Sequence, residues 1–80
     1  MYFVYILKSL KKDFHYYGST KDLNLRLREH NYGHVRSTKA NRPYVIHYFE
    51  TFKTKSEALE REKFFKSING YNWLKQKKIL

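Results

Sequence analysis

The chain has 80 residues, of which 17 are basic and 7 acidic, and its formal charge of +10 favours a polyanionic partner without specifying one. This length allows one small domain over residues 1–80, and the absence of cysteine excludes disulfides, thiol catalysis and thiolate metal sites. The apolar run Val4 to Leu7 is too short for a signal peptide or a membrane span, so we expect a cytoplasmic protein that does not enter membranes.

The first part of the chain predicts a β-hairpin followed by a helix. Tyr2 to Leu7 is rich in β-branched and aromatic residues and predicts a strand that is apolar on both faces. Phe14 to Ser19 has a similar character beyond a polar turn, which indicates the second strand of a hairpin. Asp22 can cap a helix that runs from about Leu23 to Asn31.

The pattern then returns to a strand. Residues 33–43 contain a glycine, a proline and several basic side chains, which is typical of a loop. Tyr44 to Thr51 is again aromatic and β-branched and predicts the third strand. Thr54 to Glu57 has the spacing of a capping box and opens a helix that we expect to extend to about Ser67.

A short helix is expected at the end of the chain. Ile68 to Tyr71 contains a glycine and is expected to break the preceding helix, after which Asn72 to Lys78 can form a terminal one. The order is β-β-α-β-α-α. It predicts an α+β fold in which helices flank a three-stranded antiparallel sheet.

Glu62 occupies an unusual position on the longer of these two helices. At 100° per residue the helix has an apolar stripe that includes Glu62 and is formed by Ala58, Leu59, Phe65 and Ile68. A carboxylate that faces a core is costly unless it is paired or bound to a cation. Two interpretations stay open: an ion pair with a buried arginine such as Arg26, or a ligand for Mg²⁺ or a similar hard cation.

Two polar side chains share one side of the first predicted helix. Arg26 and His30 lie four residues apart and flank the stripe formed by Leu23 and Leu27. An arginine at a core edge can clamp a phosphate and stabilise charge in a transition state, and a histidine could shuttle a proton or donate to phosphate. Either residue, taken singly, has a structural explanation as well.

Two tyrosines on adjacent predicted strands offer phenol groups. Tyr5 and Tyr16 could present their hydroxyls on the same side of the hairpin, where a phenol near a cation or arginine could activate water or hold phosphate. The chain has 8 tyrosines, so core packing is an alternative for each of them. The mixture of aromatic and basic residues could also stack nucleobases, as single-strand binders do.

In this order and spacing, these residues resemble the GIY-YIG nuclease superfamily. The similarity is to its small stand-alone bacterial members of the UPF0213 type, related to the N-terminal domain of the excision-repair incision subunit. Five segments carry it, and they are Val4-Tyr5-Ile6, Tyr16-Tyr17-Gly18, Arg26 to Asn31, Glu60-Arg61-Glu62 and Ile68 to Asn72. Two bulky residues depart from the pattern: Phe3 stands where the first signature has glycine, and Tyr17 where the second has isoleucine.

The resemblance implies a metal-dependent endonuclease that hydrolyses phosphodiester bonds in nucleic acid, with DNA as the expected substrate. Glu62 would hold one Mg²⁺ or Mn²⁺ ion, and Tyr5 would act as general base or water activator, helped by Tyr16. Arg26 would neutralise the scissile phosphate. His30 would assist proton transfer or orientation.

The resemblance adds two further residues, and two rival functions stay open. Gly18 is the glycine of the second signature, and Asn72 would support the active site. Binding by a basic surface alone predicts weak, salt-sensitive and sequence-tolerant recognition, which a protein partner could sharpen. The first rival is a non-catalytic nucleic-acid-binding module that retains the nuclease fold. The second is a protein-interaction domain whose positive charge serves an acidic partner.

Overall fold

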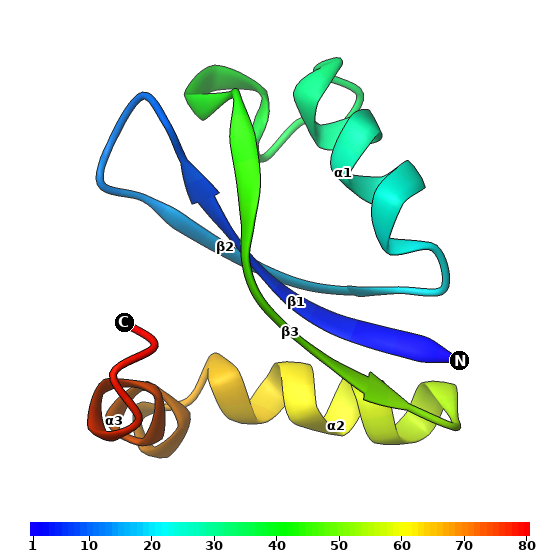
Figure 1. Ribbon diagram of the computed structural model, residues 1–80, viewed down its shortest axis with the longest axis vertical. Helices are drawn as coiled ribbons and strands as arrows, with labels where there is room; N and C mark the ends of the chain where they lie inside the picture. The colour runs from blue at the N-terminus through cyan, green and yellow to red at the C-terminus, as the bar shows by residue number, and fades with distance from the viewer.

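The structure is a computed structural model that describes residues 1–80 and contains a three-stranded antiparallel sheet with three α-helices (Figure 1). The elements in chain order are β1 (Tyr2–Ser9), β2 (His15–Thr20), α1 (Leu23–Asn31), the 3₁₀ turn η1 (Lys39–Asn41), β3 (Tyr44–Phe52), α2 (Lys55–Phe65) and α3 (Ile68–Gln76). The predicted α+β class and the order of strands and helices are confirmed. None of the helices combines the length and the hydropathy that a bilayer-spanning segment requires.

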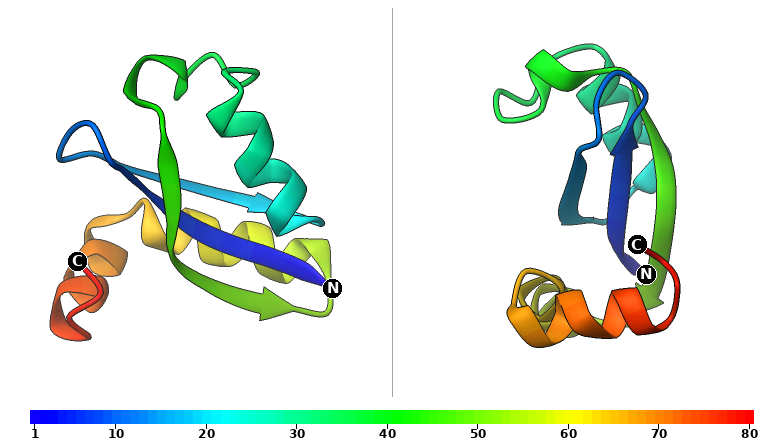
Figure 2. Two further views of the ribbon diagram at one scale, coloured as in Figure 1. Left: turned by 45° about the horizontal axis from the view of Figure 1, so that its top comes forward. Right: turned by 90° about the vertical axis from the view of Figure 1, so that its left-hand side faces the viewer.

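Strand β1 lies in the middle of the sheet, in the order β2-β1-β3, and pairs antiparallel with both neighbours. Helix α1 lies on one side of the sheet, and α2 and α3 lie on the other (Figures 1 and 2). Because side chains alternate along a strand, β1 sends residues to both sides, and its central segment Val4 to Leu7 is fully buried. The sequence prediction of a strand apolar on both faces is therefore confirmed.

The alternation along β1 divides the core in two. Val4 and Ile6 join a cluster with buried side chains of α2 and α3. Tyr5 and Leu7 point to the other side, where Tyr44 and the inner face of α1 pack against them. Each large apolar side chain buried in this way stabilises the fold by roughly 1.5–3 kcal/mol. A change in β1 therefore affects both layers together.

The helical end of the chain differs from the sequence prediction. Helix α2 ends at Phe65, and α3 already begins at Ile68, with the Ser67 side chain accepting a hydrogen bond from the Gly70 backbone N–H. Gly70 therefore lies inside a helix and does not break one. A Cβ atom at this position would lie 1.7 Å from the Phe64 carbonyl oxygen, so the close approach of α2 to α3 requires the glycine.

The predicted apolar stripe of α2 is also partly wrong. Ala58 and Phe65 are buried as expected, but Leu59 is 46% exposed and Ile68 is 77% exposed. The Glu62 side chain is 19% exposed, so it lies at the margin of the buried face instead of inside it. The face that packs on the sheet is thus rotated relative to the one that hydrophobicity indicates.

Arg61 explains that rotation. Its guanidinium group lies over the ring of Trp73 at 4.5 Å and over that of Phe65 at 4.9 Å, and it forms a 2.8 Å ion pair with Glu50. Tyr48 donates a further hydrogen bond to the same carboxylate. An arginine has a long apolar stem that can cover apolar surface when its guanidinium group is paired. Arg61 therefore packs against the core on the face of α2 where a hydrophobicity pattern expects an apolar side chain.

Candidate active site

The hairpin brings Tyr5 and Gly18 into direct contact. They are opposite each other in the β1–β2 register, and a Cβ atom on Gly18 would lie 2.5 Å from the Tyr5 hydroxyl oxygen. The phenol ring therefore lies across the glycine, and any larger residue would displace it. Tyr16 lies on the same face of β2, with its ring centroid 6.5 Å from that of Tyr5. This agrees with the prediction that both phenols face the same side of the hairpin.

His30 on α1 lies beneath these phenols and is fully buried. Its Nε2 atom lies 3.0 Å from the Tyr5 hydroxyl, and its Nδ1 atom lies 2.8 Å from the Thr38 hydroxyl. Thr38 itself donates to the carbonyl oxygen of Val35, at 3.3 Å. A hydroxyl has one proton to donate, so Thr38 accepts from Nδ1–H, and Nε2 is left to accept the proton of Tyr5.

The electrostatics of these groups agree with that arrangement. Burial raises the pKa of Tyr5 to about 12, although the neighbouring Arg26 guanidinium partly offsets the effect. Burial and, to a smaller extent, the charge of Arg26 together lower the pKa of His30 to about 4. At neutral pH Tyr5 is therefore protonated and His30 uncharged. The His30 ring lies in the core instead of flanking the Leu23/Leu27 stripe, a position that suits proton transfer through Tyr5 better than direct donation to phosphate, and both roles stay predictions.

Arg26 lies at the edge of the same cluster. Its side chain is 35% exposed, and one guanidinium nitrogen lies 3.1 Å from a Glu29 carboxylate oxygen. The phenol of Tyr5 raises the pKa of Arg26, which shows how close the two groups are. Glu29 occupies one nitrogen of a group with five N–H donors, so the guanidinium retains donors for a phosphate at its exposed side. The alternative of a buried Arg26–Glu62 ion pair is not formed.

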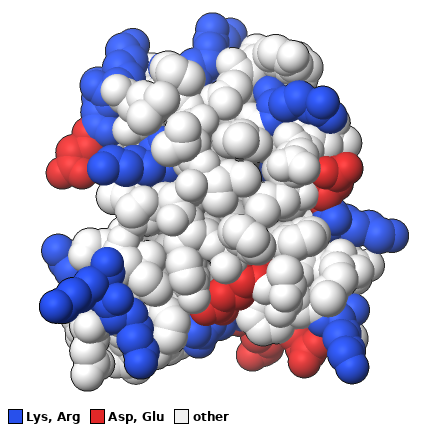
Figure 3. Space-filling view, in the orientation of Figure 1, with Lys and Arg blue, Asp and Glu red and all other residues white.

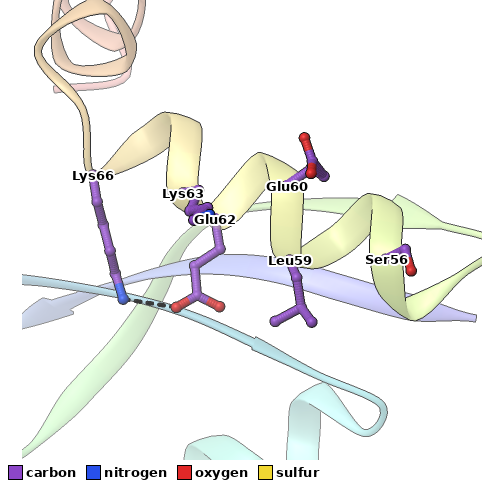
Figure 4. Close-up of a pocket in the computed structure, with 6 residues that line it drawn as sticks. All are labelled: Ser56, Leu59, Glu60, Glu62, Lys63 and Lys66. Atoms are coloured by element: carbon purple, nitrogen blue, oxygen red, sulfur yellow. Dashed lines mark hydrogen bonds and ion pairs between the residues drawn. The ribbon is translucent and has the colours of Figure 1, made fainter.

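Glu62 approaches the hairpin from α2, on the other side of the sheet. One carboxylate oxygen accepts a 2.7 Å hydrogen bond from the Ser19 hydroxyl, and the other lies 2.7 Å from the Lys66 ammonium (Figure 4). Glu62 and Lys66 point from α2 toward β2, whereas Glu60 points away (Figure 4). Ser19 directly follows Gly18 in the edge strand β2. Gly18 contacts Tyr5 on one side of the sheet and Ser19 contacts Glu62 on the other, so consecutive residues of β2 link the two groups.

The surroundings of Glu62 fit a hard cation with open coordination positions. Its carboxylate borders a cavity of about 410 Å³ and already holds one cationic group, the Lys66 ammonium. No group of three or more carboxylate, imidazole or thiol side chains gathers anywhere in the protein. One carboxylate with a nearby hydroxyl fits Mg²⁺ or Mn²⁺ bound mainly through water and substrate phosphate, and does not fit an all-protein metal cage.

Comparison with known proteins identifies the family. The GIY-YIG catalytic domain matches residues 1–76. The chain belongs to the GIY-YIG family. UPF0213 proteins from the Staphylococcus aureus strains Mu3, N315 and USA300 are each 40% identical to it over 79 residues, which is 98% of this chain and 89% of each relative. No solved structure matches significantly. Membership places the chain among nuclease-type proteins, and nucleic acid is the substrate class of such a fold.

Both departures from the GIY-YIG signatures have a place in the packing. Phe3 lies on the same face as Tyr5, two residues earlier in β1, with its ring 6.1 Å from that of Phe49. Tyr17 points to the opposite face and packs against the core cluster under α2 and α3. The contact between Tyr5 and Gly18 does not depend on either residue.

Asn72 is the one predicted site residue that is not brought to the others. It is exposed on α3, and its side chain makes no hydrogen bond. Three GIY-YIG site neighbours were not predicted from the sequence, and they are Ser19, Thr38 and Lys66. Of these, Lys66 had a recognisable signal, because it follows Glu62 by four residues and an acidic residue pairs well with a basic one at that helical spacing.

Proposed function

We propose that this protein is a metal-dependent endonuclease that hydrolyses phosphodiester bonds, with DNA as its substrate and with low sequence specificity. The observation that carries the proposal is the junction at β2. Gly18 accommodates the phenol of Tyr5 on one side, and Ser19 holds the carboxylate of Glu62 on the other. A group suited to activating water and a group suited to binding a cation therefore contact consecutive residues of the edge strand, one on each side of it.

Glu62 would hold a single Mg²⁺ or Mn²⁺ ion, which would polarise the scissile phosphate and lower the pKa of a bound water. Ser19 would orient the carboxylate through its 2.7 Å hydrogen bond. Lys66 pairs with the oxygen that faces away from Ser19, so its exposed ammonium competes for a position that the cation would need. Metal affinity is therefore expected to be modest.

Tyr5 would serve as a relay for the proton of the attacking water. Its hydroxyl donates to His30 Nε2, so the phenol oxygen keeps acceptor capacity that the neighbouring Arg26 guanidinium and an entering water would share. As the phenol takes a proton from water, its own proton can pass to Nε2. The Thr38 hydroxyl would stabilise the resulting imidazolium by accepting from Nδ1–H. The low pKa of His30, about 4, ensures that the proton is released again.

Arg26 and Tyr16 would bind the phosphate itself. The guanidinium fork of Arg26 can contact two phosphate oxygens, and it would stabilise the negative charge that develops during hydrolysis. The Tyr16 hydroxyl makes no hydrogen bond within the protein, and its side chain is partly exposed. It can therefore donate to a third oxygen of the same phosphate.

A non-catalytic nucleic-acid-binding module is the second candidate. The observation that favours it is the complete pairing of the Glu62 carboxylate with Ser19 and Lys66, which leaves no charge uncompensated without a metal. A module of this kind would use the same basic surface, and neither Glu62 nor Arg26 would have to approach the phosphate.

Incubation with Mg²⁺ or Mn²⁺ and labelled branched, nicked and single-stranded DNA separates the two candidates. Cleavage that is lost in Glu62→Ala and Arg26→Ala, but retained in the exposed control variants Asp13→Ala and Arg28→Ala, supports the endonuclease. DNA binding that is unchanged by all four substitutions, with no cleavage of any substrate, supports the binding module. No affinity for nucleic acid at low salt would contradict both and favour a protein-interaction domain.

A further inference from the structure

Four cationic side chains gather at one end of the molecule, away from the groups described above. Lys11, Arg36, Lys39 and Arg42 border a hollow of about 540 Å³, and Ala40 is the remaining residue that lines it. We refer to these four residues as the basic cluster. The three ion pairs in the protein all lie elsewhere, so no carboxylate compensates any member of the basic cluster.

The local backbone holds these side chains in place. Gly33 has a φ of +80° just beyond the end of α1, and a Cβ atom there would lie 2.8 Å from a guanidinium nitrogen of Arg42. The same nitrogen donates to the Lys39 carbonyl oxygen at 3.0 Å. The Ser9 hydroxyl donates to the Asn41 carbonyl oxygen at 2.6 Å and ties the segment to the end of β1. Gly33 therefore makes room for a cation whose position is fixed by a second contact.

The basic cluster is also fixed relative to the proposed active site. Thr38, the neighbour of Lys39, accepts from His30 through its hydroxyl and from the Tyr44 hydroxyl through its carbonyl oxygen, at 2.8 and 2.9 Å. His30 in turn contacts Tyr5. In the right-hand view of Figure 2, the segment with η1 projects on the same side of β2 as α2 does. The contacts through Thr38 and His30 link the segment that carries the basic cluster to Tyr5.

On the face shown in Figure 3, Lys and Arg side chains lie all around the periphery, the upper left included, and much of the centre over β3 is uncharged. The turn between β1 and β2 and the segment with η1 lie at this upper end in the matching view of Figure 1. Like charges held together without a counterion repel one another, and an anion in the hollow would relieve that repulsion.

We propose that the basic cluster binds the sugar–phosphate backbone of the polynucleotide whose cleavage was proposed above, at phosphates beyond the scissile one. This inference rests on that proposed function and adds how far along the strand the protein contacts its substrate. Arg36 and Arg42 can each clamp a phosphate, and Lys11 and Lys39 add point charges. Contacts of this kind set position and affinity without reading sequence. The inference therefore predicts a substrate strand that contacts the basic cluster and the proposed site together.

DNA binding without cleavage tests this inference. Fluorescence anisotropy of a labelled duplex, measured in EDTA over a series of KCl concentrations, gives the slope of log Kobs against log salt. The triple variant Arg36→Gln/Lys39→Gln/Arg42→Gln should lower the magnitude of that slope by about 0.9 for each phosphate that the protein no longer neutralises, or about 2–3 in total. Its affinity at the lowest salt concentration should fall at least tenfold.

A matched control removes the same charge elsewhere. Lys75→Gln/Lys77→Gln/Lys78→Gln also removes three positive charges, at the exposed end of α3, and should change the slope by less than one. Circular dichroism checks that both variants are folded. Because Arg42→Gln also removes the bond to the Lys39 carbonyl oxygen, the pair Lys11→Gln/Lys39→Gln gives a second test that leaves that bond in place.

The possible results separate the two levels of the proposal. A cluster variant with the affinity and slope of its matched control would overturn the binding role of the basic cluster, and metal-dependent cleavage by the wild type would stand. A wild type with no affinity for DNA or RNA at low salt would instead contradict the proposed function. A large slope change confined to the cluster variants supports the inference.

Discussion

Replacing Glu62 with glutamine separates a metal-binding role from a structural one. Glutamine has nearly the same shape, and its amide oxygen can still accept the hydrogen bond of the Ser19 hydroxyl. What disappears is the ion pair with Lys66, whose side chain is 51% exposed and four residues away on a helix. Such a pair contributes about 0.5 kcal/mol, so we expect Tm to fall by about 2–4 °C.

The effect on activity should be far larger than the effect on stability. Glu62→Gln removes the one carboxylate proposed to hold the cation, so cleavage should fall by at least about 100-fold, and Mn²⁺ binding should weaken in parallel. Single-turnover cleavage, Mn²⁺ titration followed by electron paramagnetic resonance and thermal unfolding measure the three quantities. Asp13→Asn, in the exposed turn between β1 and β2, is the control for a lost carboxylate and should leave all three unchanged.

The opposite pattern would refute this reasoning. If Glu62→Gln lowers Tm by well over 10 °C while Mn²⁺ affinity and cleavage per folded molecule stay at the wild-type level, Glu62 is a structural partner of Ser19 and Lys66. The cation would then have to bind elsewhere, and the proposed mechanism would lose its central group.

Arg26→Lys keeps the charge but loses the planar fork, so we expect single-turnover cleavage to fall more than tenfold with an unchanged Tm, and full activity would make Arg26 structural. Because the folded pKa of His30, about 4, lies below the unfolded value of 6.5, the folded state binds fewer protons between these pH values, and the urea midpoint should decline as pH falls through this window. His30→Gln should show a shallower decline; an equal one would exclude His30 as the cause. Gly70→Ala places a Cβ atom 1.7 Å from the Phe64 carbonyl oxygen and should destabilise the protein by about 1–3 kcal/mol in urea unfolding, whereas exposed Asn69→Ala should be nearly neutral.

Local signals were sufficient to predict much of this fold. The first helix begins and ends at the predicted residues. Its start is fixed by Asp22, an N-cap whose side chain accepts a hydrogen bond from the Leu25 backbone N–H. The error at the end of the chain arose from Gly70, whose role depends on the carbonyl oxygen of a neighbouring helix. A contact between elements leaves no trace in local propensity, so a pattern alone cannot distinguish a packing glycine from a helix breaker.

The candidate site was predictable to a similar extent. Alternation and hairpin pairing are enough to place Tyr5 and Tyr16 on one face. The helical stripe that indicates Glu62 is partly wrong, because Leu59 and Ile68 are exposed. The hydrogen bond from Ser19 to Glu62 joins two different elements, and the pattern of one helix cannot predict it. The burial of His30 and its bond to Thr38 depend on how the loop after α1 folds back over the sheet, which no short-range pattern determines.

Because β1 is buried on both faces, the rigidity of the proposed site depends on the stability of the whole protein. Tyr5 belongs to a strand that is hydrogen-bonded on both edges and covered on both faces. Local fluctuations cannot move its phenol aside without disrupting both halves of the interior, so that group is held in one position. Conformational changes on binding of nucleic acid would then be limited to surface side chains such as Arg26 and Lys66. The proposed site is thus preformed at its centre and flexible only at its exposed edge.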